Sequence, residues 1–340
     1  MKILFVGSQD DCSLEKWYAA HLQEQGIETK LFPAQTIFYD YYRHSLANKL
    51  LFKSGLSRIY THIERELTAE VLRFKPDVVW IFKGMEIYPS FLGWLREQKI
   101  RLVNYNADNP FLFSGPGSGN KNVTDSIGLY DLHLAYDTEV RKRIEKEYGI
   151  PCGLLPFGYE LPDLLYEQCI RQEEVRSVCF LGNPDRQRAE FLRRLAEDLP
   201  VHVYGTRWND YLEHPRITFF GPVYGDEFWK VLYRYRVQLN LMRVHNPRSH
   251  NMRSFEIPGV GAIGLFPDTP DHRTYFEDQK EVFLYKDAGD CVRLATEILA
   301  MPDEQAQQIR LNARRRSVTS GYSYYERIKA VLPLVLNTHA

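Results

Sequence analysis

The strongest constraint on the fold of this chain is a cycle of apolar runs and amphipathic stretches that occurs twice along its 340 residues. The first cycle opens with an apolar run over residues 2–6 that ends in Gly7, and the second with a run over residues 176–181 that ends in Gly182. Strands that alternate with helices pair in parallel through right-handed crossovers. The sequence therefore predicts an α/β protein with two tandem doubly wound domains that face a cleft, where open α/β sheets bind ligands.

Each half of the chain contains enough elements for one sheet. In the first half we expect strands at 28–32, 77–82, 101–106, 131–136 and 153–157, and helical regions at 13–25, 38–74, 89–98 and 138–148. In the second half we expect strands at 201–204, 216–220, 237–242, 262–266 and 281–285, and helices at 187–197, 226–235 and 251–259. A polar stretch over residues 159–175 is the predicted linker. The predicted domains are residues 1–160 and 161–320, followed by a helix at 321–340 that is able to pack back on the first domain.

Composition excludes several classes of protein. Basic and acidic residues nearly cancel, 43 against 44, so no charge excess indicates a nucleic-acid partner. The cysteines are odd in number and lack metal-ligand spacing, which favours free thiols in a reducing compartment; they are Cys12, Cys152, Cys169, Cys179 and Cys291. No apolar run reaches the length of a transmembrane segment, and the N-terminal run is too short for a signal peptide. We therefore expect a soluble, cytoplasmic protein.

The stretch from residue 239 to residue 261 carries the clearest chemical signal. It reads as a strand, a polar loop with His250 and Asn251, and a helix that begins near Arg253 and continues through Glu256. Free backbone N–H groups at a helix start favour an anion, and an arginine there can hold phosphate oxygens in a bidentate geometry. A glutamate one turn further can accept hydrogen bonds from the two hydroxyls of a ribose. The alternative is a surface loop followed by a packed helix with solvated charges.

Several segments of the chain resemble a known family. Residues 219–285 contain FFGPVYGDEFWKVLYRYRVQLNLMR, HNMRSFEIPGVGAIGLF and FEDQKEVFLY, and the first half contains RLVNYNADNPF and LLPFGYE. These segments resemble the CgeB-like (spore-maturation-type) glycosyltransferases of the GT-B superfamily. The resemblance implies two Rossmann-like domains, with an acceptor site in the N-terminal domain and a nucleotide-sugar donor site in the C-terminal domain. It does not identify the sugar or the acceptor.

The resemblance also implies roles for particular positions of the donor site. Glu256 matches the glutamate that holds the nucleotide ribose, and Asn251 and Arg253 lie where diphosphate contacts fall. The other matching positions belong to three loops: Val223 and Tyr224 near the base, Gly182 and Asn183 with Arg186 and Arg188 after them behind the first strand of the donor domain, and Tyr204, Gly205 and Trp208 in a further segment near the base. From its place in the polar loop, His250 is a candidate to meet the sugar or the leaving phosphate; the alternative is a solvated loop histidine, and the same two interpretations apply to His245.

The catalytic base remains open between two places at strand ends. Asp108 follows the strand at 101–106, and Asp10, with Asp11, follows the first strand. An inverting transfer needs such a carboxylate near the acceptor hydroxyl. The alternatives are a turn former for Asp108 and helix N-terminal acids for Asp10 and Asp11. Retaining enzymes with a Glu-x7-Glu pattern carry a glutamate where this chain has Arg248, so inversion and retention both stay open.

The expected function is transfer of a sugar from a nucleotide-diphosphate sugar to a glycan, lipid-linked or protein acceptor. No Asp-x-Asp pattern in a strand-end context indicates a metal site, so we expect Arg253 to stabilise the leaving diphosphate without a metal or other cofactor. The alternatives are a nucleotide-sugar epimerase on the same scaffold and a non-catalytic nucleotide-sugar-binding subunit. Residues 43–65 mix leucines with basic side chains. They predict a helix packed on the N-terminal sheet, or else peripheral contact with a membrane.

Overall fold

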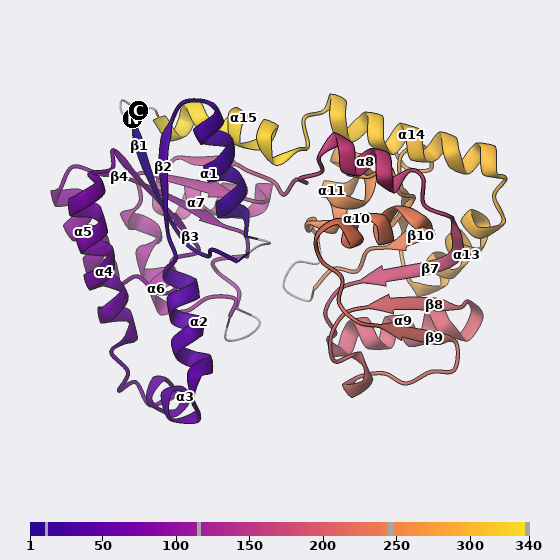
Figure 1. The fold of residues 1–340 in the computed structure, drawn as a ribbon, viewed down its shortest axis with the longest axis horizontal. Coiled ribbons are helices and arrows are strands. Elements are labelled where there is room, and N and C mark those ends of the chain that lie inside the picture. The colour runs from indigo at the N-terminus through magenta and orange to yellow at the C-terminus, as the bar shows by residue number, and fades with distance from the viewer. Residues whose placement is uncertain (11–12, 114–116, 244–247, 337–340) are drawn as a thin grey trace. The chain divides into compact units, whose positions relative to one another are not determined.

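The computed structural model describes residues 1–10, 13–113, 117–243 and 248–336 of the chain. These residues form two compact units (Figure 1). Unit 1 contains Met1–Pro156 and the C-terminal segment that begins at Tyr324, and unit 2 contains Phe157–Ser323. Each unit has its own parallel sheet of six strands, which confirms the predicted α/β class.

The sheet of unit 1 has the strand order β2-β1-β3-β4-β5-β6, and all neighbouring strands are parallel. The strands are β1 (Lys2–Val6), β2 (Glu28–Phe32), β3 (Val78–Phe82), β4 (Arg101–Asn106), β5 (Leu132–Ala135) and β6 (Cys152–Leu154). The order reverses between β1 and β3, where Val6 pairs with Ile81. Doubly wound sheets bind ligands outside the carboxyl ends of the two strands at such a switch point.

The helices of unit 1 differ from the prediction over residues 38–74 and in one short helix, Lys121–Ser126, that the sequence did not predict. They are α1 (Leu14–Glu24), α2 (Ala34–His44), α3 (Leu46–Lys53), α4 (Ile59–Phe74), α5 (Pro89–Glu97), α6 (Lys121–Ser126), α7 (Thr138–Tyr148) and α15 (Tyr324–Leu336). The predicted helical region over residues 38–74 is three helices. Ser45 ends α2 and its hydroxyl accepts a hydrogen bond from the Asn48 amide at 3.1 Å, which starts α3. Gly55, at φ +76°, then takes the left-handed conformation of the turn after α3.

The sheet of unit 2 has the order β12-β11-β10-β7-β8-β9, again with all neighbours parallel. Its strands are β7 (Val175–Leu181), β8 (Val201–Tyr204), β9 (Ile217–Phe220), β10 (Tyr235–Leu239), β11 (Gly264–Pro267) and β12 (Phe283–Tyr285). Its helices are α8 (Asp163–Cys169), α9 (Arg186–Asp198), α10 (Gly225–Arg234), α11 (Arg253–Gly259), α12 (Pro270–Tyr275), α13 (Ala288–Ala300) and α14 (Asp303–Thr319). The switch point of this sheet lies between β7 and β10. Helix α8 lies inside the stretch that the sequence predicted to be a linker.

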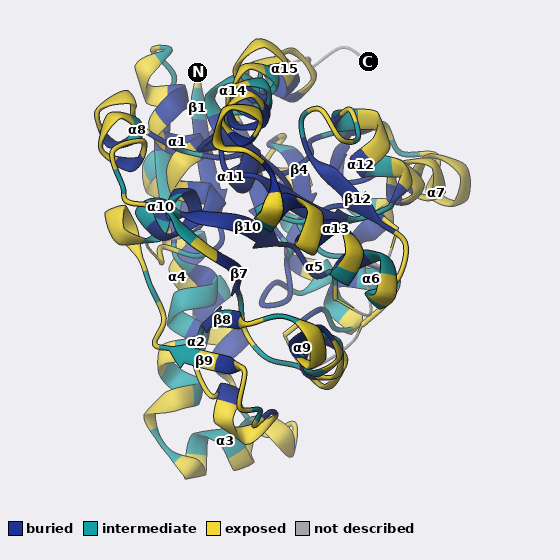
Figure 2. Cartoon of the chain, turned by 90° about the vertical axis from the view of Figure 1, so that its right-hand side faces the viewer, coloured by how far each residue is buried: buried dark blue, intermediate teal, exposed yellow. Residues whose placement is uncertain are grey.

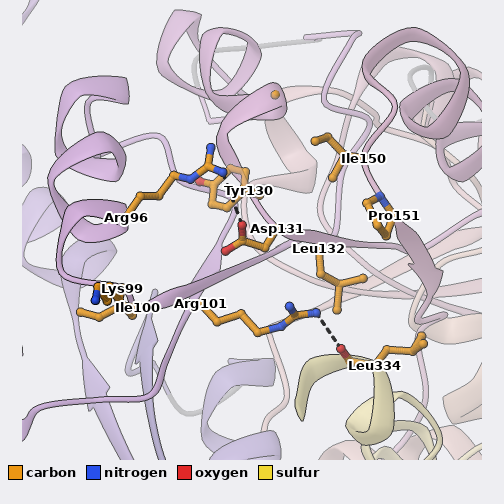
Figure 3. A pocket seen from close by; sticks show the side chains of 11 residues that line it. Arg96, Lys99, Ile100, Arg101, Tyr130, Asp131, Leu132, Ile150, Pro151 and Leu334 are labelled. Carbon is orange, nitrogen blue, oxygen red and sulfur yellow. Dashed lines mark hydrogen bonds and ion pairs between the residues drawn. The ribbon is translucent and has the colours of Figure 1, made fainter. Parts of the chain in front are cut away.

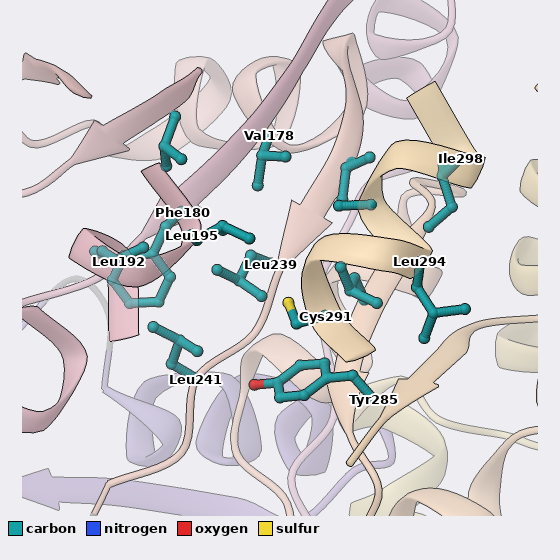
Figure 4. Packing of buried hydrophobic residues seen from close by; sticks show 14 of the residues in the cluster. Val178, Phe180, Leu192, Leu195, Leu239, Leu241, Tyr285, Cys291, Leu294 and Ile298 are labelled. Atoms are coloured by element: carbon teal, nitrogen blue, oxygen red, sulfur yellow. The ribbon is translucent and has the colours of Figure 1, made fainter. Parts of the chain in front are cut away.

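A continuous apolar core fixes the switch-point strands of unit 2. Figure 4 shows Phe180 of β7 and Leu239 of β10 in one apolar cluster with leucines of α9 and with Leu294 of α13, and these two helices contact each other. Strand β10 is buried along its length and β7 is buried from Ser177 to Leu181 (Figure 2), as expected for the inner strands of a parallel sheet. The loops that follow these strands therefore start from rigid positions.

The described cysteines are all buried free thiols. Burial raises the pKa of Cys169 to about 11 and that of Cys152 to about 12, so neither is a reactive thiolate at neutral pH. Cys12 lies outside the described residues. Over the same described part of the chain, no helix combines the length and the apolar character needed to cross a membrane.

Candidate functional site

The switch point of unit 2 is held together by Arg188, a residue of the first turn of α9. Its guanidinium donates to the carbonyl of Asn183, in the loop after β7, at 3.0 Å and to the carbonyl of Leu241, just beyond β10, at 2.8 Å. Burial, together with repulsion from the neighbouring Arg243 and Arg253, lowers the pKa of Arg188 to about 10. Arg188 thus stays cationic at neutral pH, and three arginines give this end of the sheet a positive potential.

Gly182 and Gly205 meet at the ends of β7 and β8. The Gly182 amide donates to the Tyr204 carbonyl at 3.0 Å, and the Trp208 indole donates to the Gly182 carbonyl at 2.9 Å. A Cβ atom on Gly205 would lie 2.4 Å from the Gly182 oxygen, so only glycine fits there. The buried Trp208 ring therefore supports the loop after β7 from below.

Arg253 and Glu256 form an ion pair within the first turn of α11. The guanidinium of Arg253 also lies over the ring of Phe228, 4.4 Å from its centroid. The Glu256 residue is 6% exposed, whereas the Arg253 side chain is 28% exposed. The predicted ribose acceptor and the predicted diphosphate donor are thus partners of each other in this structure.

A buried polar network fixes the start of α11. The side chain of Asn251 donates to Asn240 at 2.8 Å, and its oxygen accepts from the amide of Ser254, in the first turn of α11, at 3.2 Å. The Ser254 hydroxyl lies 2.8 Å from Nε2 of His272. Burial lowers the pKa of His272 to about 4, so this ring is neutral and accepts the hydrogen bond from Ser254. Asn251 therefore positions Arg253 through the helix start.

His250 is fully buried. Its Nδ1 lies 2.7 Å from Asp271 and its Nε2 accepts from the Phe157 amide at 3.3 Å. Burial alone would raise the pKa of Asp271, but the hydrogen bonds from His250 and Ser249 lower it below its ordinary value. A carboxylate on Nδ1 and an N–H donor on Nε2 select the neutral tautomer with its proton on Nδ1. Both expectations for His250, a solvated loop side chain and a group free to meet the sugar, disagree with these contacts.

The remaining predicted donor residues lie in different environments. The hydroxyl of Tyr204 is 3.0 Å from that of Tyr235 and accepts from Arg234 at 2.7 Å, inside the unit. Arg186 is exposed on α9, in a groove with Ala288 and away from the contacts of Arg188. Val223 is half-buried, and Tyr224 is 67% exposed just before α10. Arg248 is exposed, and Asp11 and His245 lie outside the described residues.

In unit 1, a cavity of about 280 Å³ lies at the switch point between β1 and β3 and is lined by both predicted catalytic carboxylates, Asp10 and Asp108. Asp108 pairs with Lys83 at 2.7 Å, and its amide donates to the Asn106 side chain at 3.0 Å. Asp10 is exposed at the rim, where its amide donates to the Ser8 hydroxyl at 3.1 Å. The structure thus brings the two candidates together in one cavity.

Glu15 is a third carboxyl group of this cavity, and the sequence analysis missed it. It is 5% exposed and accepts a hydrogen bond from the Ser8 amide at 2.9 Å. Burial, with a smaller contribution from the charge of Asp10, raises the pKa of Glu15 to about 7. A Cβ atom on Gly7 would lie 2.2 Å from its carboxyl oxygen, so the glycine at the end of β1 makes the room for it. In the sequence, the only indication of this buried carboxyl group is that a glutamate follows Ser13 by two residues, at the start of the helix after Gly7.

A larger cavity of unit 1, about 540 Å³, lies at the opposite edge of the sheet (Figure 3). It is lined by residues that precede or begin β4, β5 and β6, among them Arg101 and Asp131. Arg101 donates to the Leu334 carbonyl of α15 at 3.0 Å, and Arg96 lies 3.7 Å from Asp131. This edge carries the amino ends of the strands, so we do not include it in the candidate site.

Metal-ligating side chains do not gather in threes anywhere among the residues that the structure describes.

The comparisons with known proteins agree with this architecture. A family described as glycosyl transferase-like matches residues 186–333. Three solved structures are similar over nearly the whole chain. Sucrose-phosphate synthase from Thermosynechococcus elongatus has a TM-score of 0.69 and 12% identity over 98% of each chain, and a glycosyltransferase from Rickettsia africae has a TM-score of 0.65 and 12% identity over 99% of each chain. UDP-GlcNAc 2-epimerase from Neisseria meningitidis, bound to UDP-GlcNAc, has a TM-score of 0.60 and 15% identity over 99% of this chain and 100% of the epimerase chain. None of the curated proteins matches the sequence.

At such identities these structures show the fold alone, and the family match covers less than half of the chain. Residues 186–333 are thus similar to the glycosyl transferase-like family, and the chain as a whole shares with these solved structures a fold of two parallel α/β sheets.

Proposed function

We propose that this protein transfers a sugar from a nucleotide-diphosphate sugar to an acceptor hydroxyl, with the donor bound by unit 2. The observation that carries the proposal is the group of Arg188, Arg243 and Arg253 at the carboxyl ends of β7 and β10, beside the nearly buried Glu256. A diphosphate needs positive charge, and a ribose needs a carboxylate that accepts two hydrogen bonds. This edge of unit 2 offers both.

Ligand binding would exchange the partners of the Arg253–Glu256 pair. The diphosphate takes the guanidinium of Arg253, and the ribose hydroxyls donate to Glu256. Each charged group then keeps a partner, so neither is left unpaired away from water. Arg253 is already oriented by the ring of Phe228, 4.4 Å from its guanidinium, which lowers the cost of ordering its side chain. Positive charge from arginines in place of a divalent ion is part of the proposal, and full activity in EDTA is the result expected from it.

Unit 1 supplies the acceptor site in this proposal. For an inverting transfer, a carboxylate of the 280 Å³ cavity takes the proton of the acceptor hydroxyl. The acceptor oxygen forms a bond to C1 of the sugar, and the bond from C1 to the diphosphate oxygen breaks, which releases the nucleoside diphosphate. We assign Asp108 as this base, with Asp10 as the alternative. The Lys83 ammonium at 2.7 Å holds the Asp108 side chain in the cavity.

Glu15 offers a further proton acceptor in the same cavity. A general base works best when its pKa lies near the working pH, and the pKa of Glu15, about 7, meets this condition. Its side chain is buried behind Ser8, so it would reach an acceptor from the floor of the cavity. Comparing Glu15→Gln with Asp108→Asn therefore separates the two assignments.

The donor proposal is tested by binding. We expect one class among UDP, GDP, dTDP and CDP, with or without a sugar, to raise the melting temperature, and calorimetry should then give one site per chain. The Glu256→Gln variant keeps the shape of the side chain and should lose most of this shift. Glu304→Gln makes the same change at an exposed glutamate of α14 and is the matched control, which should keep the shift. Failure of every nucleotide to bind would refute the proposal.

The alternative is epimerisation of the sugar on its nucleotide. Epimerisation needs acid–base groups near the sugar but no acceptor. The pKa of Glu15, about 7, suits a group that takes up and releases a proton at neutral pH, and this observation supports the alternative. An epimer formed from the donor in the absence of any acceptor would decide for this reaction. A chain that binds the nucleotide sugar without hydrolysing it or forming either product would be the non-catalytic subunit. Within the glycosyl transferase-like proteins, the more specific resemblance to CgeB-like enzymes stays a prediction.

A further inference from the structure

Helix α3 presents an apolar surface that none of the described residues of unit 1 covers. Its Leu46 and Leu50 are 76% and 69% exposed, and Leu56, in the turn that follows, is 73% exposed. Leu51 is 43% exposed, and no residue of α3 is buried. Single exposed leucines are common on protein surfaces, but four within eleven residues form a patch. We name these four leucines the α3 patch.

The position of α3 follows from the way the chain leaves the sheet. Helix α2 begins just beyond the carboxyl end of β2, and α3 then lies at the end of unit 1 away from the N-terminus before α4 returns (Figure 1). The inward side chain of α3 is Phe52, whose ring lies 4.9 Å from that of Phe38 and 5.6 Å from that of Tyr60. Phe52 thus fixes the helix while the leucines face outward, and Figure 2 shows α3 largely exposed. The expectation that the apolar face packs on the sheet is wrong for these leucines.

The charges around the patch have one sign. Residues 41–63 contain Arg43, Lys49, Lys53 and Arg58 and no aspartate or glutamate. In the chain as a whole, basic and acidic residues nearly cancel, so this segment departs from the average of the protein. Exposed leucines flanked by cations are the pattern of a helix that binds at an anionic bilayer surface.

We propose that α3 docks unit 1 on an anionic membrane surface, with the α3 patch in the interface and the basic residues against lipid phosphates. A second copy of this chain is a poorer occupant, because the same patch would bring its own cations together in a symmetric contact. The membrane supplies both the apolar phase for the leucines and the opposite charge for the basic residues. The proposal does not depend on the transfer reaction.

The docking has a consequence for the acceptor, and this part rests on the proposed function. Gln35, in the first turn of α2, lines the acceptor cavity, and α2 spans about 16 Å from there to α3 at 1.5 Å per residue. A surface docked at α3 therefore lies within reach of an acceptor group carried by a lipid. A lipid-linked acceptor would be presented to the cavity by the same membrane.

The test uses the full chain and vesicles of known composition. In co-sedimentation we expect binding to phosphatidylcholine–phosphatidylglycerol vesicles, much weaker binding to phosphatidylcholine alone, and a fall in binding as salt is added. Serine at positions 46, 50 and 56 (Leu46→Ser, Leu50→Ser, Leu56→Ser) should weaken the partitioning on the order of 10²-fold. The substitutions Lys53→Glu and Arg58→Glu should abolish the preference for anionic vesicles.

The matched control makes the same change at exposed leucines elsewhere. Leu112, Leu164 and Leu311 are 50%, 82% and 45% exposed, and their triple serine variant should bind vesicles like the unchanged protein. Circular dichroism and the melting temperature show whether each variant folds. The proposal is overturned if the α3 variant binds as tightly as the control, or if neutral vesicles bind equally well. It is also overturned if the chain ignores vesicles and instead forms a dimer that the α3 variant cannot form. Nucleotide binding, measured separately, stays intact in each of these cases unless the donor proposal itself fails.

Discussion

Replacing Glu15 by glutamine should remove a pH dependence from the stability of unit 1. The unfolded chain releases the proton of this carboxyl near pH 4.5, whereas burial keeps it bound in the folded protein up to about pH 7. The folded state therefore holds more protons than the unfolded state between these values. The contribution to the free energy of unfolding is largest below pH 4.5, falls as the pH rises to about 7, and is constant above it.

The size of the effect follows from the shift. One pKa unit corresponds to about 1.4 kcal/mol, so a rise from 4.5 to about 7 gives a loss of about 3 kcal/mol between pH 4 and pH 8. Glutamine keeps an oxygen that can accept from the Ser8 amide, now 2.9 Å from the carboxyl oxygen, and it does not ionise. The variant should therefore gain stability relative to the unchanged protein as the pH rises.

The assay is urea unfolding of both proteins at several pH values from 4 to 8, with the difference between them as the readout. Burial also raises the pKa values of Glu64 and Glu86 to about 7, so these two residues add their own pH dependence to the stability of both proteins. Their contribution cancels in the difference between the two proteins, which leaves that of Glu15. Glu24→Gln makes the same chemical change at an exposed position of α1 and measures the effect of losing a surface carboxylate. A difference between the Glu15 variant and the unchanged protein that is the same at pH 4 and pH 8 would refute the reasoning.

Four further changes test the sites directly. Glu256→Ala should weaken binding of the preferred nucleotide by about 1.5–3 kcal/mol for each hydrogen bond lost, and unchanged affinity in calorimetry would remove the residue from the site. Arg253→Lys should weaken binding of the nucleoside diphosphate and leave the nucleoside unaffected, because an ammonium cannot form the bidentate contact; equal losses would mean a structural role. Asp108→Asn should keep donor affinity and lower turnover by roughly 10²–10⁴, with Asp10→Asn as its control, and normal turnover of the first with loss in the second would move the assignment. Gly205→Ala should lower the melting temperature by several degrees, since its methyl group would overlap a backbone oxygen at 2.4 Å, and an unchanged value would contradict the close approach of the two loops.

The sequence was a good guide where local pattern decides structure. Most strands of both sheets are buried apolar runs, with glycines directly after β1 and β7, and these runs were sufficient to predict two parallel α/β sheets. The break between α2 and α3 was missed because the cap at Ser45 is a single hydrogen bond within a continuous helical pattern. Helix α8 was missed because its segment is polar and short.

The candidate site was predictable only in part because its key contacts are tertiary. Arg188 joins carbonyls that lie 5 and 53 residues away along the chain, which no local spacing reveals. The sequence analysis named both Arg186 and Arg188 after the loop that follows β7, and it could not tell that Arg186 is exposed in a groove of α9 whereas Arg188 is buried. Glu15 owes its raised pKa to burial beneath the loop after β1. In the sequence it cannot be told apart from the acidic residues that are common in the first turn of a helix. His250 looked like a loop residue, and its fully buried ring follows from Asp271 and Phe157, which are distant in sequence.

The return of the chain to unit 1 has a consequence for its synthesis. Helix α15 packs on α1 and β6, with Tyr324, Ile328, Val331 and Val335 all nearly or fully buried. Unit 2 is a continuous segment and can complete its sheet while the end of the chain is still being made. Unit 1 begins first but ends last, since one face of α1 waits for residues more than 300 positions later. A ribosome that stops before Tyr324 would therefore release a chain whose second half is finished and whose first half still exposes part of its core.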